Sequence, residues 1–340
     1  MEDIEFQAYK QTFSFYDPTR DFEPTERVTE IRKDPLTERT SHILDMQFQV
    51  EKPDVEEIVK RARSGFDPFA ADTREQATPR FLEGDLPEGR LRVGEATVIP
   101  NLFPRDRFSA VTILSEADYI PLTGFTSQIL DDAFSADIVY LERTRGKNPD
   151  LKHFSVNWNY MHLAGASLIH PHHQLIASPI PTNYLREVET GLSKYKHGGD
   201  YFKDLVAVEQ ERDERWIGRL GSVAWITAYA PLGHLDIVGV FEGRRSLFDL
   251  NREDLRSLSQ GLSRIFGFLD SENFVSFNFA LYGLEDVENF TVHCRLSPRF
   301  LLSTSLMNSE INYFEVLHND PLAYFSPETS AQKVRLKFWG

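Results

Sequence analysis

The residues of this chain whose types and spacing could do chemistry are three histidines within four positions. They stand in residues 165–177, which read GASLIHPHHQLIA, and an apolar run follows them directly. Glycine and serine before the histidines and prolines after the apolar run are typical of a strand with turns at its ends. Because side chains alternate along a strand, His170, His172 and Gln174 should share one face, and His173 should lie on the other.

Three kinds of site fit two imidazoles and a carboxamide on one face. They could be half-buried polar side chains that only hydrogen-bond to each other and to the fold. They could be metal ligands, since His-x-His is a common ligand spacing, but residues 175–181 lack the acid that a cupin-like site needs. They could also perform nucleophilic catalysis, with Gln174 donating to a developing anion. We favour this third interpretation, because imidazole is neutral near pH 7 and is a good nucleophile toward phosphorus.

The elements that must position these residues form a pattern that occurs twice. Two strands, a helix and one strand precede the histidine segment, at residues 96–99, 110–114, 127–141 and 154–160. The same order recurs at residues 223–228, 237–241, 252–268, 274–282 and 290–296. Asn157 and Asn278 are 121 positions apart (278 − 157), and His172 and His293 are too (293 − 172). The equal offset predicts an α+β fold of two tandem units, each an antiparallel sheet with one main helix.

The second copy lacks the chemistry of the first. Residues 291–295 read Thr-Val-His-Cys-Arg, with neither the paired imidazoles nor the glutamine. We therefore expect that only the first copy is active and that His293 has a structural role.

Composition and charge exclude several classes of protein. The chain has 340 residues, 41% of them hydrophobic, which is enough for a large core, and its one cysteine, Cys294, excludes an internal disulfide. A net charge of −15 argues against a nucleic-acid partner, although a local basic pocket for one nucleotide is compatible with it. The first residues lack the pattern of a signal peptide, and no run reaches the length of a membrane span. We expect a soluble, cytoplasmic protein with no membrane partner.

Three segments together resemble one family. AGASLIHPHHQLIA resembles the active-site strand of galactose-1-phosphate uridylyltransferases and ADP-glucose phosphorylase-like proteins, a branch of the histidine triad superfamily. Residues 32–37, RKDPLT, and 98–104, VIPNLFP, resemble two other elements of that family. The resemblance implies two histidine-triad-like units. We expect an arm laid over the body at residues 1–30, a first unit at 31–205 with the active-site strand, and a degenerate second unit with the C-terminal segment at 206–340.

The chemistry of the histidine segment would be a double displacement. His172 would attack the α-phosphorus of a nucleoside diphosphate compound and hold the nucleoside monophosphate until a phosphate-bearing acceptor takes it. The resemblance implies that Gln174 donates to a non-bridging oxygen, and that the backbone at His170 fixes the tautomer of His172.

The resemblance also implies where the substrate lies. Ser167 and the backbone of Gly165 would line the phosphate path, Asn159 would contact phosphate, and Asn101 and Phe103 would hold ribose and base. Structural alternatives remain open for two of these residues, since Asn159 could cap a turn and Phe103 could belong to the core.

The C-terminal region departs from the family at its sugar-binding positions. Glu315 matches an acid that contacts the sugar. Ser309 and Pro321, however, stand where the galactose enzymes have a lysine and a glutamine. This departure argues against galactose 1-phosphate as the substrate.

The family's structural zinc site is also altered. In the family a Cys-Pro-Phe-Cys pair binds zinc, and here residues 67–70 read Asp-Pro-Phe-Ala. A further ligand position falls at Asp118, which leaves His170 as the only usual ligand type. The set of Asp67, Asp118 and His170 could hold a harder ion, but loss of the thiolates removes most of the affinity for zinc. We therefore expect neither zinc nor another cofactor.

These features predict a nucleotidyltransferase of nucleotide-sugar and carbohydrate metabolism. It would move a nucleoside monophosphate between a nucleoside diphosphate sugar and a phosphorylated acceptor. One alternative is a nucleoside diphosphate sugar phosphorylase that uses inorganic phosphate, and another is a nucleotide-binding protein without turnover. The resemblance further implies a homodimer.

Overall fold

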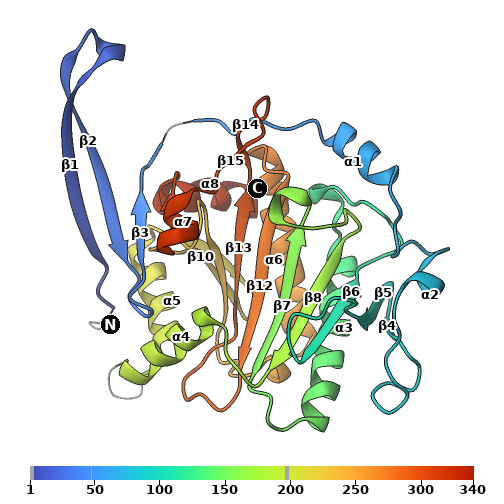
Figure 1. Cartoon of the computed structure of the whole chain (residues 1–340). Helices are drawn as coiled ribbons and strands as arrows, with labels where there is room; N and C mark the ends of the chain where they lie inside the picture. The colour runs from blue at the N-terminus through green and yellow to red at the C-terminus, as the bar shows by residue number, and fades with distance from the viewer. Residues whose placement is uncertain (1–3, 47, 196–198) are drawn as a thin grey trace.

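The computed structural model describes residues 4–46, 48–195 and 199–340, and a single ten-stranded sheet forms its centre (Figure 1). The first half contains β4 (Leu91–Val93), β5 (Ala96–Pro100), β6 (Phe108–Ile113), β7 (His153–Tyr160) and β8 (His172–Ser178). The second half contains β9 (Trp216–Leu220), β10 (Val223–Thr227), β11 (Ile237–Phe241), β12 (Ser276–Leu284) and β13 (His293–Arg299). The spatial order is β4-β5-β6-β8-β7-β12-β13-β11-β10-β9, and each strand runs antiparallel to its neighbours.

Each half carries its main helix at the same point of the chain, between its third and fourth strands. These helices are α3 (Ser127–Lys147) and α6 (Arg252–Ser271). Each begins at a capping residue, Thr126 for α3 and Asn251 for α6, whose side chain accepts from the first turn. The predicted α+β fold of two tandem units is therefore confirmed.

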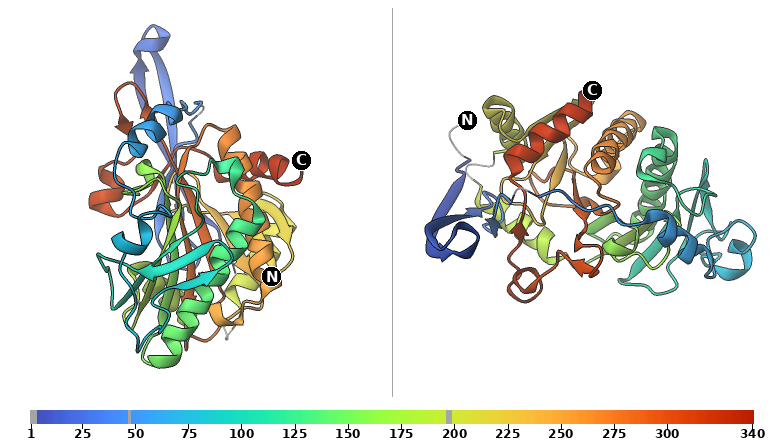
Figure 2. Two further views of the ribbon diagram at one scale, coloured as in Figure 1. Left: turned by 90° about the vertical axis from the view of Figure 1, so that its right-hand side faces the viewer. Right: turned by 90° about the horizontal axis from the view of Figure 1, so that it is seen from above.

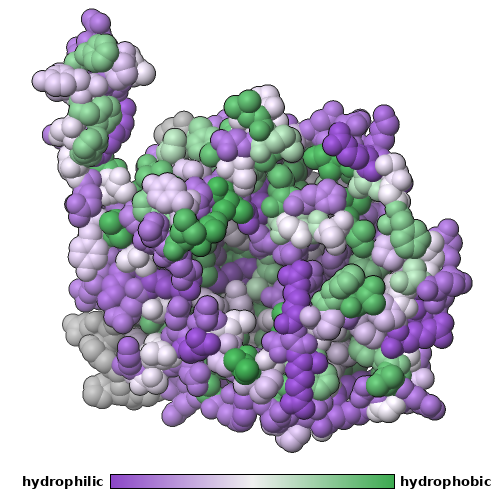
Figure 3. Space-filling view, in the orientation of Figure 1, coloured by the Kyte–Doolittle hydropathy of each residue, from purple (hydrophilic) through white to green (hydrophobic). Residues whose placement is uncertain are grey.

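The helices cover one face of the sheet and leave the other face more open. Seen from above, α3 and α6 lie side by side on one face, with α8 (Pro327–Trp339) beside α6 (Figure 2). Alternation along β7 follows this arrangement: Val156 and Trp158 are buried against the helices, and Asn157 and Asn159 are half-buried on the opposite face. The open face is hollowed in its middle (Figure 3).

In the second half, two helices cover the open face. They are α4 (Asn183–Lys194) and α5 (Tyr201–Arg212). Tyr184 of α4 reaches His293 on β13. The boundary expected at residues 205/206 falls inside α5, so a continuous helix joins the two units there.

The N-terminal arm is a hairpin rather than an irregular segment laid over the body. Strands β1 (Gln7–Asp17) and β2 (Glu23–Lys33) pair along their whole length and project from the molecule, so the arm extends past residue 30 (Figure 1). Its large side chains stay exposed because no other element covers them, as Phe13 and Tyr16, each 71% exposed, illustrate. Strand β2 returns to the body through β3 (Thr40–Ile43), which pairs with β16 (Leu322–Ala323).

The remaining elements are short, and the first of the 3-10 turns forms the tip of the β1–β2 hairpin. They are α1 (Val55–Arg63), α2 (Arg74–Ala77), α7 (Tyr313–His318), β14 (Leu301–Ser303), β15 (Asn308–Ser309), and 3-10 turns η1 (Pro18–Arg20), η2 (Leu122–Gly124), η3 (His162–Ala164) and η5 (Leu247–Asp249). No helix among the described residues combines the length and apolar character that crossing a membrane requires.

Candidate active site

A cavity of about 240 Å³ opens on the uncovered face of the first half. Its walls come from the end of β5, from β6 and β8, and from the segments before α2 and before β8. Five of the residues expected at the site line this cavity: Asn101, Phe103, Ser167, His172 and Gln174. Tertiary structure thus brings together residues that lie up to 73 positions apart (174 − 101).

His172 is the first residue of β8, and its ring is held in one tautomer. Nδ1 lies 2.8 Å from the carbonyl oxygen of His170, which can only accept, so Nδ1 carries the proton and Nε2 the free electron pair. Nε2 has no partner among the described residues and is not one of the fully buried polar atoms, so it is open to the cavity. Burial of the ring lowers the pKa of His172 to about 4. The imidazole is therefore neutral at pH 7 and nucleophilic at Nε2.

Gln174 lies two residues further along β8 on the same face, as the alternation predicts. Its carboxamide makes no hydrogen bond within the described part of the chain and lines the cavity. Its backbone is fixed, because Asn157 on the neighbouring strand donates through Nδ2 to the carbonyl oxygen of Gln174 at 3.1 Å. A donor on a rigid strand with no internal partner is suited to binding an oxyanion.

His170 lies behind the cavity rather than in it. It is 1% exposed, and its Nδ1 lies 2.8 Å from Asp67 Oδ2 and its Nε2 3.0 Å from the carbonyl oxygen of Ser115. Burial would raise the pKa of Asp67, but the hydrogen bond with His170 and one from the Phe69 backbone lower it overall. His170 thereby ties two loops to the start of β8 and places the carbonyl that holds His172.

The structure does not assemble a zinc site from the residues at the family's ligand positions. Asp118 turns to Arg63, whose Nε and Nη2 lie 2.7 and 2.8 Å from its carboxylate oxygens. The Arg63 hydrogen bond lowers the pKa of Asp118. His170 uses both ring nitrogens in hydrogen bonds, and the described residues contain no group of three potential ligands. This donor set does not fit zinc, so the absence of zinc remains our prediction.

The mouth of the cavity contains the two residues that the resemblance assigned to ribose and base, Asn101 and Phe103. Asn101 accepts from the backbone N–H of Phe103 at 3.0 Å and donates to Ser109 Oγ at 3.2 Å, which shapes the turn after β5. This turn presents Phe103 to solvent with 79% of its surface exposed. Phe103 therefore does not belong to the core and is available to stack on a base.

Among the cavity residues that were not expected from the sequence, an aromatic ring and a cation bear on its chemistry. Phe69 packs edge-on against the His172 ring at 5.3 Å between centroids, and it shields that ring from water. Arg105 lines the mouth and forms no ion pair with the described residues. The position of Arg105 directly after the VIPNLFP segment was a usable signal, whereas Phe69 stood in a motif that suggested only metal binding.

Besides His170, three of the expected residues lie outside the cavity wall. Asn159 and Gly165 are adjacent, since a Cβ on Gly165 would lie 3.9 Å from Asn159 Nδ2. Both stand beside the segment that leads to Ser167. Glu315 lies on α7, 3.5 Å from His234, and is not brought to the His172 cavity within one copy of the chain.

The opposite face of β8 carries a separate buried cluster. His173 is fully buried, with Nδ1 2.7 Å from Asp137 on α3 and its ring against Trp158. Asp137 also accepts from the hydroxyl group of Thr112. His173 thus points away from the cavity, as the alternation predicts, and ties the active-site strand to the main helix.

The second copy keeps the geometry of its histidine but not its access. His293 Nδ1 lies 2.8 Å from the carbonyl oxygen two residues earlier, as in His172. Its Nε2, however, is 2.9 Å from the hydroxyl group of Tyr184, and Phe202 stacks on the ring. Arg295, at the position equivalent to Gln174, is paired with Asp236. The side chains in the second copy therefore leave only a cavity of about 40 Å³ beside His293, where the first copy has one of about 240 Å³.

The chain is similar to known proteins in its sequence and in its structure. No protein-family model matches it. An uncharacterised protein of Archaeoglobus fulgidus is 30% identical over 319 residues, which are 91% of this chain and 92% of that protein. A GalT-like protein of Arabidopsis thaliana has a similar structure, with 18% identity, a TM-score of 0.68, and coverage of 90% of this chain and 98% of that one. An ADP-glucose phosphorylase of Arabidopsis thaliana with bound ADP-glucose matches with 19% identity, a TM-score of 0.67 and the same coverage. A uridylyltransferase matches with 17% identity and a TM-score of 0.63, over 91% of this chain and 98% of that one.

Proposed function

Since the chain belongs to one family with the Archaeoglobus fulgidus protein and has the fold of the galactose-1-phosphate uridylyltransferase-like proteins of the histidine triad superfamily, we propose that it is a nucleotidyltransferase. It moves a nucleoside monophosphate from a nucleoside diphosphate sugar to a phosphorylated acceptor. The observation that carries this proposal is His172, whose Nε2 is neutral, unpartnered and open to the cavity.

In the first step Nε2 of His172 forms a bond to the α-phosphorus, and the bond from that phosphorus to the bridging oxygen breaks. The sugar phosphate leaves with the electron pair, and the nucleoside monophosphate stays on the imidazole. Gln174 donates to a non-bridging oxygen, Asn101 and Phe103 hold the nucleoside, and Ser167 faces the phosphates from the cavity wall. Asn159, which lies outside that wall beside Gly165, contacts the phosphates from there. In the second step an oxygen of the acceptor phosphate attacks, and the imidazole leaves.

The test is detection of the covalent intermediate by intact-protein mass spectrometry. With UDP-glucose or ADP-glucose the protein should gain the mass of one nucleoside monophosphate, and the adduct should be acid-labile and base-stable. His172→Asn should abolish the adduct, and His293→Asn, the same change at the duplicated position, should keep it. A labelled His172→Asn variant would refute the covalent mechanism.

Acceptors then separate the remaining possibilities. Release of the label by a hexose 1-phosphate indicates a transferase, and release by inorganic phosphate indicates a nucleoside diphosphate sugar phosphorylase. Nucleotide binding without any label indicates a binding protein. A homodimer is part of the proposal, supported by the uncovered aromatic side chains of the β1–β2 hairpin, and light scattering at two concentrations tests it.

A further inference from the structure

A side chain of the second unit reaches into the first unit at the junction where β12 pairs with β7. Asn278 on β12 donates through Nδ2 to Asn159 Oδ1 at 2.8 Å and to the carbonyl oxygen of Ala164 at 2.8 Å. Asn159 is the last residue but one of β7, and Ala164 lies in the loop of residues 161–168, which contains Ser167 of the cavity. The second unit thus contacts both the phosphate-facing asparagine and the loop beside it.

An arginine fixes the direction of these hydrogen bonds. Arg299 Nη1 lies 3.0 Å from Asn278 Oδ1, and a guanidinium can only donate, so Asn278 must turn its oxygen to Arg299 and its NH₂ group to Asn159. Arg299 is itself held by the buried carboxylate of Glu310. The orientation of Asn278 is therefore not free.

This orientation determines that of Asn159. Because Asn159 accepts with Oδ1, its own NH₂ group points the other way, toward Gly165. That NH₂ group has no hydrogen-bond partner within the described ranges. Asn159 is half-buried, so part of its surface is accessible to a ligand. It is a donor turned toward the segment that lines the phosphate path.

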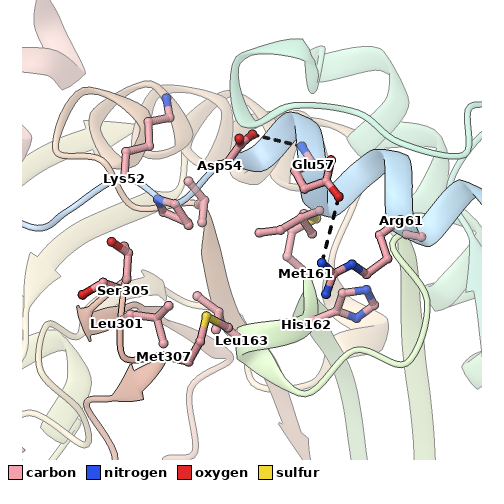
Figure 4. Close-up of a pocket in the computed structure, with 15 residues that line it drawn as sticks. Lys52, Asp54, Glu57, Arg61, Met161, His162, Leu163, Leu301, Ser305 and Met307 are labelled. Atoms are coloured by element: carbon pink, nitrogen blue, oxygen red, sulfur yellow. Dashed lines mark hydrogen bonds and ion pairs between the residues drawn. The ribbon is translucent and has the colours of Figure 1, made fainter.

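The loop itself is strained and needs such support. Met161 has φ 65° and ψ 167°, a region that is populated almost only by glycine, and it is 3% exposed. Its carbonyl oxygen accepts from the N–H groups of Ala164 and Ala166 at 3.2 and 3.3 Å. Met161 and Leu163 line a second, mainly apolar cavity with Met307, beneath helix α1 (Figure 4), whereas Ser167 of the same loop lines the His172 cavity. The loop therefore lies between two cavities, and Asn278 provides a hydrogen bond to it from the sheet.

We propose that Asn278 is a positioning residue for nucleotidyl transfer. It turns the amide of Asn159 toward the phosphate, and it holds the backbone of residues 164–167 at the distance from the phosphate that the reaction needs. The role in transfer rests on the proposed function, whereas the support of the loop does not. The second unit, whose own histidine is covered, thus completes the site of the first.

The test compares two substitutions on the same strand. In Asn278→Asp the introduced carboxylate can no longer donate, so Asn159 turns its NH₂ group toward it and presents Oδ1 to the phosphate. The rate of adduct formation at saturating donor should fall by about tenfold or more, with little change in KM, since the lost bond strengthens as charge develops. Ser276→Ala is the matched control, because Ser276 Oγ also bonds across the junction, to the carbonyl oxygen of Tyr160 at 2.6 Å, and does not touch the loop. It should keep the wild-type rate.

A second measurement does not depend on activity. Hydrogen exchange at the amides of Ala164 and Ala166 should accelerate in Asn278→Asp and remain slow in Ser276→Ala. If Asn278→Asp does not fold, Asn278→Ser removes the same bonds without adding a charge.

The outcomes separate this inference from the proposed function. A variant that is labelled as fast as wild type, with an equally protected loop, overturns the role of Asn278 and leaves the transferase standing. Faster loop exchange in a protein that no donor labels supports Asn278 as the support of the loop and counts against the proposed function. An equal loss of rate in Ser276→Ala reduces the role of Asn278 to general stability and overturns the inference.

Discussion

At the residue scale, the groups around the His172 imidazole set its tautomer and its charge. A carbonyl oxygen takes the proton of His172 Nδ1, burial keeps the ring neutral, and Phe69 limits the access of water. In the second copy the surroundings of Nδ1 are similar, but the hydroxyl group of Tyr184 hydrogen-bonds to Nε2 of His293. Access to Nε2, and not the identity of the residue, therefore distinguishes the two copies.

The pH dependence of adduct formation should reflect the buried imidazole. Burial lowers the pKa of His172 to about 4, so its free electron pair is present throughout the range from pH 8 to 6. The rate should be level in that range and fall only below about pH 5, as the ring becomes protonated. Single-turnover labelling at a series of pH values measures this. A midpoint at the ordinary histidine value near 6.5 would contradict it.

Gln174→Ala should slow labelling without preventing folding. The carboxamide has no hydrogen bond to lose within the described part of the chain, so the melting temperature should hardly change. If the carboxamide donates to the oxyanion in the transition state, the rate should fall by about 10²-fold or more. Quenched labelling measures the rate, and a thermal melt of the same preparation measures the stability. A normal rate would remove Gln174 from the reaction.

At the element scale, hydrogen bonds tie the segment before β8 to two loops, and an ion pair ties α1 to one of these loops. His170 bonds the loop of Asp67 and the carbonyl of Ser115, and Arg63 of α1 pairs with Asp118. In the contact between His170 and Asp67 the histidine side chain is 1% exposed. In the ion pair between Arg63 and Asp118 both side chains are exposed. The two contacts should therefore differ in their contribution to stability.

Asp67→Asn should cost more than Arg63→Ala. Weakening a bond to a buried histidine costs about 1–3 kcal/mol, whereas an exposed ion pair contributes about 0–1 kcal/mol. Denaturant unfolding of the two variants measures the difference. Asp67→Asn should also slow labelling, since His170 positions the carbonyl that holds His172. Equal losses of stability in the two variants would contradict the larger contribution expected of the buried contact.

Chelation should leave the protein unchanged. With Asp67 and Ala70 in place of thiolates, purified protein should contain no stoichiometric zinc and should melt at the same temperature in EDTA. Elemental analysis measures the zinc content, and thermal melts with and without EDTA measure the stability. Tight zinc that is lost together with the fold would show that Asp67, Asp118 and His170 do converge on an ion.

At the scale of the whole molecule, the duplicated sheet buries several histidines that must be neutral in the folded state. Burial lowers the pKa values of His153 and His234 to about 4 and of His293 to about 3. Because these values lie below that of an unfolded chain, near 6.5, the unfolded state binds more protons between pH 6.5 and 4. Their contribution to stability is complete above pH 6.5 and is lost as pH falls through that range.

The melting temperature should accordingly fall between pH 6.5 and 4. His153→Leu should reduce this fall, since Nδ1 of His153 is buried without a partner and leucine has nothing to protonate. Calorimetry at pH 7, 6 and 5 on both proteins tests the expectation. A pH dependence that is unchanged in the variant would exclude His153 as a contributor.

The sequence by itself determined the features that arise from local pattern. Apolar periodicity placed the starts of α3 and α6 correctly and most strands within a few residues, and the offset of 121 revealed the duplication. Strand alternation separated His172 and Gln174 from His173, because the period of two leaves no other arrangement on a regular strand.

Only the tertiary structure decided what depends on contacts between distant segments. Phe69 and Arg105 enter the cavity from irregular segments, where no periodicity reports the direction of a side chain. The pairing of β7 with β12, which brings Asn278 to Asn159, and the filling of the second site by Tyr184 join residues more than 100 positions apart. Such contacts depend on how two whole units pack, and a linear pattern with a period of two or 3.6 residues carries no information about that packing.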